Sequence, residues 1–173
     1  MESALKVTVP HRSVAEKNTL AAGIITGQVA GLIMAVVVMA VFAVVLGKNP
    51  LLPVQVIGST LFGESALQGF HLGALLTGLV LHQLGPSLLW GLIFGVLAKK
   101  FSIATPMQAL GLGLTIGIVS MIGPYVLIPT LMNALHGVDY WNREVPLLWD
   151  WAAHIVFGIS FVLYPKVQAQ FFA

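Results

Sequence analysis

Two histidines, His82 and His154, are the residues best suited to do chemistry, because each lies inside a long apolar stretch, where an ionisable side chain is costly. His82 stands beside Gln83, one turn before a Gly-Pro pair. His154 follows Asp150 by four residues, a spacing that places both side chains on one helical face within hydrogen-bonding reach. These histidines are the candidate cofactor-binding residues.

Two interpretations are open for each histidine. His82 and His154 could flank a haem b iron if their helices face each other, or Asp150 could orient His154 as a metal ligand or proton shuttle. In the simpler interpretation, His82 is neutral and bonds across helices, while Asp150 benefits from the positive end of a helix dipole. We expect no bound cofactor and no catalytic or metal-binding set, with haem b as the alternative.

The composition predicts a membrane protein. Of the 173 residues, 58% are apolar and 8% are charged, and the mean hydropathy is +0.95, whereas a soluble domain carries about 25% charged residues. The net charge is only +2 and no basic cluster occurs, so no nucleic-acid partner is expected. The absence of cysteine excludes disulfides and thiolate metal sites.

Four apolar segments are long enough to cross a bilayer, which takes about 20 helical residues. We expect an all-α, integral membrane four-helix bundle. The predicted spans are 20–46, 72–98, 107–132 and 147–164, within a membrane domain of residues 20–166 between an N-terminal segment, 1–19, and a tail, 167–173. Pro146, which precedes the fourth span, is a common residue at the start of a helix.

The distribution of Lys and Arg predicts the orientation. Six of them fall on one side of the four spans, and Lys48 and Arg143 fall on the other. The six are Lys6, Arg12, Lys17, Lys99, Lys100 and Lys166. Both termini are therefore expected in the cytoplasm, with the two longer loops outside.

Glycines recur every fourth residue on two of the predicted helices. They are Gly23, Gly27 and Gly31 on the first span, and Gly113 and Gly117 on the third. Lipid tails are as apolar as leucine, so membrane helices associate through close packing at small residues. These stripes predict helix packing, either within the chain or against another membrane subunit.

Two pairs of short segments, one of each pair in the first two predicted spans and one in the last two, are similar in sequence. Residues 27–35 resemble residues 113–121, and residues 92–97 resemble residues 155–160. A two-helix unit repeated in the same orientation would place the segments in this order. The alternative is that membrane helix pairs commonly use small residues in this way.

Aromatic residues gather at the predicted outer interface. Trp149 and Trp151 flank Asp150, and Trp141 precedes them in the loop; Trp is enriched where membrane meets water. We expect these four residues to anchor the outer interface. No Asp, Glu, Lys or Arg lies in the middle of a span, which disfavours an ion-coupled transporter or channel.

The segments Gly73–Leu97 and Ala153–Pro165 resemble the second and fourth helices of small bacterial inner-membrane proteins of unknown function. The matching positions are His82, Ser87, His154, Phe157 and Gly158, and the Gly-Pro pair departs from the smoother second helix of those proteins. The resemblance implies a four-helix fold in the bacterial inner membrane and no established activity.

Taken together, these patterns favour a non-catalytic accessory subunit that packs against other integral membrane subunits within the bilayer. A respiratory or other redox complex is one such assembly. The alternatives are a haem- or metal-binding electron-transfer protein that uses His82 and His154, and a small transporter or channel.

Overall fold

The structure of the chain, a computed structural model, describes residues 14–172, and of residues 14–17 it describes the backbone alone. Every regular element among the described residues is helical, which confirms the predicted all-α class. In chain order the elements are α1 (Val14–Val44), α2 (Leu52–Phe62), η1 (Gly63–Leu67), α3 (Leu72–His82), η2 (Gln83–Ser87), α4 (Leu88–Lys100), α5 (Pro106–Ser120), η3 (Gly123–Leu127), α6 (Ile128–His136), α7 (Tyr140–Glu144), α8 (Leu147–Ser160), η4 (Phe161–Leu163) and α9 (Tyr164–Phe172).

Four helical segments are long and apolar enough to cross a membrane, and each overlaps one predicted span. They are Asn18–Val44, Leu72–Lys100, Pro106–His136 and Leu147–Phe172. The third and fourth extend beyond the predicted ends, because the helix continues past the apolar run into polar residues. Of the predicted N-terminal segment, residues 1–13, with Lys6 and Arg12, lie outside the described residues, and residues 167–172 of the tail belong to α9.

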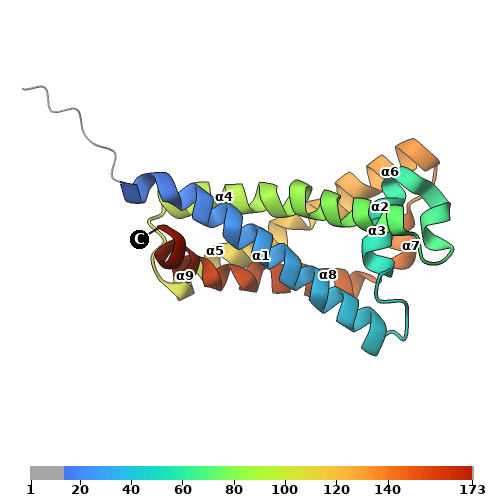
Figure 1. The fold of residues 1–173 in the computed structure, drawn as a ribbon, viewed down its shortest axis with the longest axis horizontal. Helices are drawn as coiled ribbons and strands as arrows, with labels where there is room; N and C mark the ends of the chain where they lie inside the picture. The colour runs from blue at the N-terminus through green and yellow to red at the C-terminus, as the bar shows by residue number, and fades with distance from the viewer. Residues whose placement is uncertain (1–13, 173) are drawn as a thin grey trace, which may run out of the picture.

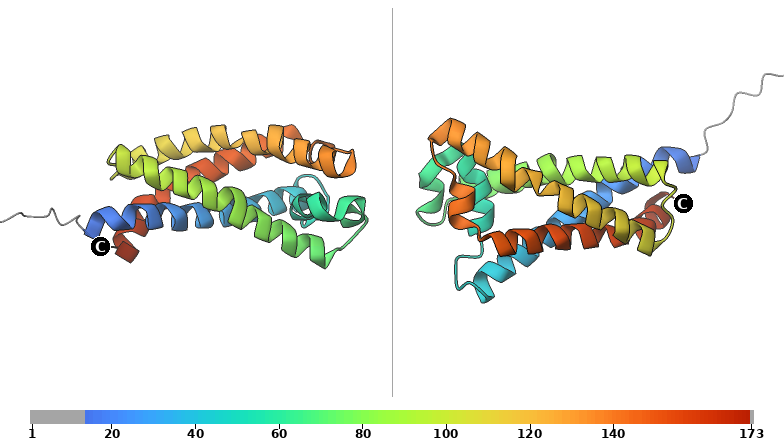
Figure 2. Two further views of the ribbon diagram at one scale, coloured as in Figure 1. Left: turned by 90° about the horizontal axis from the view of Figure 1, so that it is seen from above. Right: turned by 180° about the vertical axis from the view of Figure 1, so that it is seen from behind.

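The four segments form an elongated bundle in which α1 runs obliquely across the others (Figures 1 and 2). The start of α1, the α4–α5 connection and α9 lie at one end, which we call the termini end; α2, α6 and α7 lie at the other, the α2–α7 end. At the termini end, the Asn18 side chain donates to the Phe172 carbonyl over 3.2 Å. The bundle thus has two chemically different ends.

Local sequence determines where several helices begin. Thr105 caps α5: its hydroxyl accepts from the Gln108 amide, and the Gln108 side chain accepts from the Thr105 amide, a reciprocal capping box. Pro146 occupies the cap position of α8, as the sequence predicted. His71 caps α3, because its Nδ1 accepts from the Ala74 amide at 3.0 Å.

A Gly-Pro pair widens the helix in two of the four segments. Pro86 lies in η2 and Pro124 lies in η3, and both elements are single π-helical turns. Proline has no amide hydrogen to donate and its ring crowds the preceding turn, so the backbone bonds shift to a wider spacing; the Leu88 amide bonds to the Gln83 carbonyl. Pro86 therefore lies in a π-turn inside a continuous helical segment.

The glycines of α1 bring it into backbone contact with the second segment. A Cβ placed on Gly23 would lie 2.5 Å from the Gly95 Cα, and one placed on Gly27 would lie 2.5 Å from the Gly91 Cα. No side chain fits at such distances, so the two backbones touch. Gly31 continues the stripe against the Ser87 side chain.

A second crossing joins α5 to α8. A Cβ on Gly117 would lie 3.1 Å from the Gly158 Cα, and Gly113 faces the Gly158 carbonyl and Phe161. Both predicted glycine stripes thus pack within the chain rather than against a different subunit.

The two crossings share one contact pattern, which does not align all the similar segments of the sequence. Gly95 faces the Thr19 carbonyl and the Leu20 Cα, just as Gly158 faces the Gly113 carbonyl and the Leu114 Cα. Gly91 makes the same contacts, with the Gly23 carbonyl and the Ile24 Cα, so the pattern repeats along the first crossing and does not select one alignment of residues 155–160. Gly27 meets Gly91 and Ser87, whereas Gly113 meets Gly158, the counterpart of Gly95 in the sequence. The two expected similarities, residues 27–35 with 113–121 and residues 92–97 with 155–160, therefore do not hold in one register. The spacing of glycines alone could not set this register, because one glycine every fourth residue matches itself after each turn.

Aromatic side chains fill the space between the two crossings. Phe94 of α4 stacks on Phe161 at 4.4 Å between ring centroids, and Tyr164 lies 5.0 Å from Phe94. All three side chains are fully buried. This cluster closes the middle of the bundle toward the termini end.

Candidate functional site

The polar residues singled out in the fourth segment meet at the start of α8. Asp150 and His154 lie one turn apart, and the Asp150 Oδ1 is 3.3 Å from the His154 Nδ1, which also lies 2.9 Å from the Asp150 carbonyl oxygen. The other carboxylate oxygen, Oδ2, accepts from the Trp141 indole at 3.1 Å. The predicted contact between Asp150 and His154 is present, and Trp141 completes it.

Burial corrects the expected role of two of the interface residues. Trp141 is 8% exposed and Asp150 is 6% exposed, so neither lies at an exposed rim. The chain turns through α7 before α8, and this turn folds the indole inward over the carboxylate. Trp149 and Trp151 are half-buried, and the Trp151 indole donates to the Tyr125 hydroxyl at 2.8 Å.

Asp150 and His82 line one cavity of about 50 Å³ at the α2–α7 end of the bundle. The other lining residues are apolar or aromatic, and they come from α1, α2, α3, α8 and the segment between Trp141 and Val145. They are Met34, Ala35, Val38, Phe42, Pro53, Val54, Ile57, Leu79, Trp141, Val145, Trp149 and Ala153. The His82 Nδ1 is buried and has no hydrogen-bond partner among the described residues.

His82 lines the cavity together with Ala153, the residue before His154, although the two histidines come from different segments. Their surroundings do not fit a haem between them. A ligand pocket has about 300 Å³ or more, while this cavity has about 50 Å³ and His154 is not in its lining. The described residues also contain no group of three or more His, Cys, Asp or Glu side chains that could hold a metal ion.

Gln28 and Gln83 meet beside the cavity. The Gln28 side chain donates to the carbonyl of Gln83, the first residue of the π-turn, at 2.8 Å. The amide group of Gln83 and the hydroxyl of Ser87 are buried without partners. These polar atoms and His82 occupy consecutive turns of one segment against α1.

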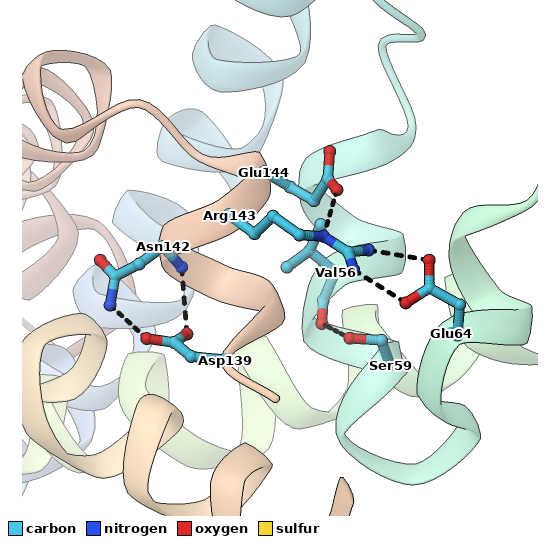
Figure 3. A network of polar contacts seen from close by, with 7 residues as sticks. All are labelled: Val56, Ser59, Glu64, Asp139, Asn142, Arg143 and Glu144. Carbon is cyan, nitrogen blue, oxygen red and sulfur yellow. Dashed lines mark hydrogen bonds and ion pairs between the residues drawn. The ribbon is translucent and has the colours of Figure 1, made fainter. Parts of the chain in front are cut away.

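The α2–α7 end is held by an ion-pair cluster that the sequence did not point to (Figure 3). Arg143 of α7 makes two 2.9 Å bonds to the Glu64 carboxylate of η1 and a third, of 2.8 Å, to Glu144. The guanidinium lowers the pKa of Glu64 below its usual value by hydrogen bonding and by its charge, and the two carboxylates raise the pKa of Arg143. All of these side chains remain partly exposed to solvent.

A buried glutamine fixes the adjoining loop. Gln55 is 1% exposed, and its amide nitrogen donates to the carbonyls of Ala66 and Gly69, each at 2.7 Å. The ring of His136 lies 2.9 Å from the Thr60 carbonyl, which links α6 to α2. A lone Gln or His in an apolar sequence does not reveal such a partner, because the partner is a backbone carbonyl.

One glycine lies where no packing requires it. Among the glycines of the four long segments, Gly85, Gly111 and Gly123 meet no other residue within 4 Å of a built Cβ. Gly85 and Gly123 precede the prolines of the two π-turns, whereas Gly111 lies in the regular helix α5. Thr115, one turn later on the same exposed face, bonds its hydroxyl to the Gly111 carbonyl.

Comparison of the chain with family models, curated proteins and solved structures gave no match. The resemblance to small bacterial inner-membrane proteins therefore stays a prediction.

Proposed function

We propose that this protein is a non-catalytic subunit of a larger membrane assembly, and that it docks onto a helix of another integral membrane protein through the exposed face of α5. We place it in the bacterial inner membrane with the termini end in the cytoplasm. The proposal combines the length of the helices, the distribution of charge and the surface of α5.

The four long segments support insertion into a bilayer. Each is at least 26 residues long and predominantly apolar, and a helix needs about 20 residues to cross a bilayer. Lys99, Lys100 and Lys166 belong to elements at the termini end, whereas Lys48 and Arg143 are the only described Lys and Arg residues toward the α2–α7 end. An excess of Lys and Arg marks the cytoplasmic side.

The single observation that carries the docking proposal is the open surface at Gly111. Glycine elsewhere in the regular helices of the bundle meets a neighbour, most often a backbone, while Gly111 meets nothing within 4 Å. Gly111 and Thr115 form a small-residue notch between large exposed side chains, Met107 on one side and Ile118 on the other. A notch of this kind lets a second helix approach closely and gain dispersion contacts.

The polar cluster at Asp150 is consistent with a structural role for the site. Both carboxylate oxygens of Asp150 are engaged, one by Trp141 and one by His154. The carboxylate therefore braces the connection between α7 and α8.

The proposal is tested by purifying the tagged protein from native membranes in mild detergent and identifying co-eluting membrane proteins by mass spectrometry. Gly111→Leu fills the notch without touching the rest of the bundle, so we expect a companion subunit to be lost while the fold is retained. Ala40→Leu is the matched control, because Ala40 is exposed on α1, and it is expected to keep the companion.

Equal recovery of every companion with Gly111→Leu and with Ala40→Leu would overturn docking through α5. A wild-type chain that elutes alone would overturn the role as a subunit.

A further inference from the structure

We infer that the cavity at His82 is a hydrated pocket, which takes water and solutes of similar size from the α2–α7 end and ends blindly beside the Gln28–Gln83 contact. This inference rests on the insertion of the four segments into a membrane, as in the proposed function. It assigns the pocket a ligand class and a single side of entry.

The size of the cavity limits its contents to water and solutes of similar size. A water molecule needs about 10–15 Å³ of such volume and two to four polar partners, so a cavity of about 50 Å³ holds a few waters. An engineered apolar cavity that takes benzene has about 150 Å³, so ring-sized ligands do not fit. Two groups of the lining, the His82 imidazole and the Asp150 carboxylate, can hydrogen-bond to water.

Unpartnered polar atoms show where water is needed. The His82 Nδ1 and the Gln83 amide are buried without a partner, and so is the hydroxyl of Ser87, which is 1% exposed. Buried polar groups in proteins are bonded to protein or to ordered water. Of these residues, only His82 lines the cavity, while Gln83 and Ser87 face Gly31 of α1. The His82 Nδ1 is therefore the group that water in the cavity would satisfy.

The elements around the cavity determine its side of entry. Its walls come from the second half of α1, from α2 and α3, and from the segment Trp141–Ala153, all of which lie toward the α2–α7 end. Toward the termini end, the backbones of Gly27 and Gly91 touch, and the stacked rings of Phe94 and Phe161 fill the middle of the bundle. Water therefore has one route to His82 and no route through the protein.

The test uses single-cysteine variants, which is straightforward because the chain has no cysteine of its own. Ala35→Cys and Ala153→Cys place a thiol in the cavity lining on two different helices, α1 and α8. Ala30→Cys is a core control at 0% exposure, and Val36→Cys is a control at 65% exposure, on the surface rather than in the cavity lining. The probe is the silver ion, which is small and binds thiols; protection from later maleimide labelling in denaturant measures the reaction.

We expect the thiols of Ala35→Cys and Ala153→Cys to react with silver about tenfold or more faster than those of Ala30→Cys and Val36→Cys, because a thiol in apolar surroundings forms little thiolate. In sealed vesicles, the fast reaction is expected when silver is added on the α2–α7 side and not on the termini side. Adding His82→Leu to the Ala35→Cys variant removes a polar partner for water and should slow the reaction.

The outcomes separate this inference from the proposed function. Slow reaction of both Ala35→Cys and Ala153→Cys would overturn the hydrated pocket, and equally fast reaction from both sides would overturn the blind end. A reaction of Val36→Cys as fast as that of Ala35→Cys would mean that α1 is not surrounded by lipid, which overturns membrane insertion itself. If adding His82→Leu leaves the rate of the silver reaction at Ala35→Cys unchanged, His82 does not hold water in the cavity.

Discussion

The glycines of this protein differ in how closely other residues approach them. Gly27 has the backbone of Gly91 within 2.5 Å of a built Cβ, whereas Gly111 has open space. The same amino acid therefore supports an internal contact in one helix and an unoccupied surface in another.

We predict opposite results for alanine at these two positions. Gly27→Ala forces the α1 and α4 backbones apart and should lower the free energy of unfolding by about 1–3 kcal/mol, the usual cost of overpacking. Gly111→Ala should leave it unchanged or raise it, because alanine favours a helix over glycine by about 0.5–1 kcal/mol. Reversible unfolding in mixed detergent micelles measures both, and equal losses would contradict the described packing.

Asp150 should stabilise the fold through its two partners. Asp150→Leu leaves the Trp141 indole buried without an acceptor, which should lower the free energy of unfolding by about 1–3 kcal/mol. Asp150→Asn keeps an acceptor oxygen and should cost less. In a double-mutant cycle with Trp141→Phe, the losses should not add; full additivity would show that the two residues do not interact.

For individual residues, the sequence predicted contacts within one helix but not contacts that depend on how the helices pack. The contact between Asp150 and His154 was predictable because i,i+4 spacing on a helix is local. The inward turn of Trp141 was not, because it depends on how α7 packs against the bundle. For the same reason, the aromatic residues around Asp150 were expected at a membrane rim, and one of them proved to be buried.

Among the elements, α7 and η1 are joined by an ion pair at the α2–α7 end. Arg143 joins α7 to η1 through Glu64, and the pair holds the pKa of that carboxyl below its usual value. A lowered carboxyl pKa means that the pair stabilises the fold above the usual pKa, near 4.5, and that this stabilisation is lost as the pH falls through the lowered value. The contribution is small, since the side chains are exposed to solvent and salt.

We predict that the Glu64 carboxyl, followed by NMR titration in micelles, titrates below its usual range in the wild type. Arg143→Met, which removes the charge, should return the pKa of Glu64 toward its usual value. Lys48→Met at the same end is the control and should not change it. A Glu64 titration that is the same with and without Arg143 would contradict the ion pair.

The long elements were predictable from the sequence, while their irregularities were not. The length of the apolar runs predicts the four membrane-spanning segments, because a helix needs about 20 residues to cross a bilayer. From the sequence, Pro86 and Pro124 predict only that the helix is interrupted. Whether the interruption becomes a kink or a wider π-turn depends on the neighbouring helices. The register of the two glycine crossings likewise needed the three-dimensional contacts.

For the whole molecule, we predict that both termini face the cytoplasm. A fluorescent reporter that folds only in the cytoplasm should be active when fused after Ala173. A phosphatase that is active only outside the cytoplasm should be active when inserted at Gly69, an exposed loop position with a φ of +142°. The reverse pattern of activity would show that the chain is inserted the other way round.

Docking through α5 is tested by photo-crosslinking in native membranes from Ile118, which is 51% exposed on the α5 face beside Gly111 and Thr115. We predict one adduct, with a different integral membrane protein, which is lost with Gly111→Leu and does not form when the crosslinker replaces Val36 on α1. No adduct from Ile118, an adduct only with a second copy of this chain, or an adduct unaffected by Gly111→Leu would contradict docking as an accessory subunit.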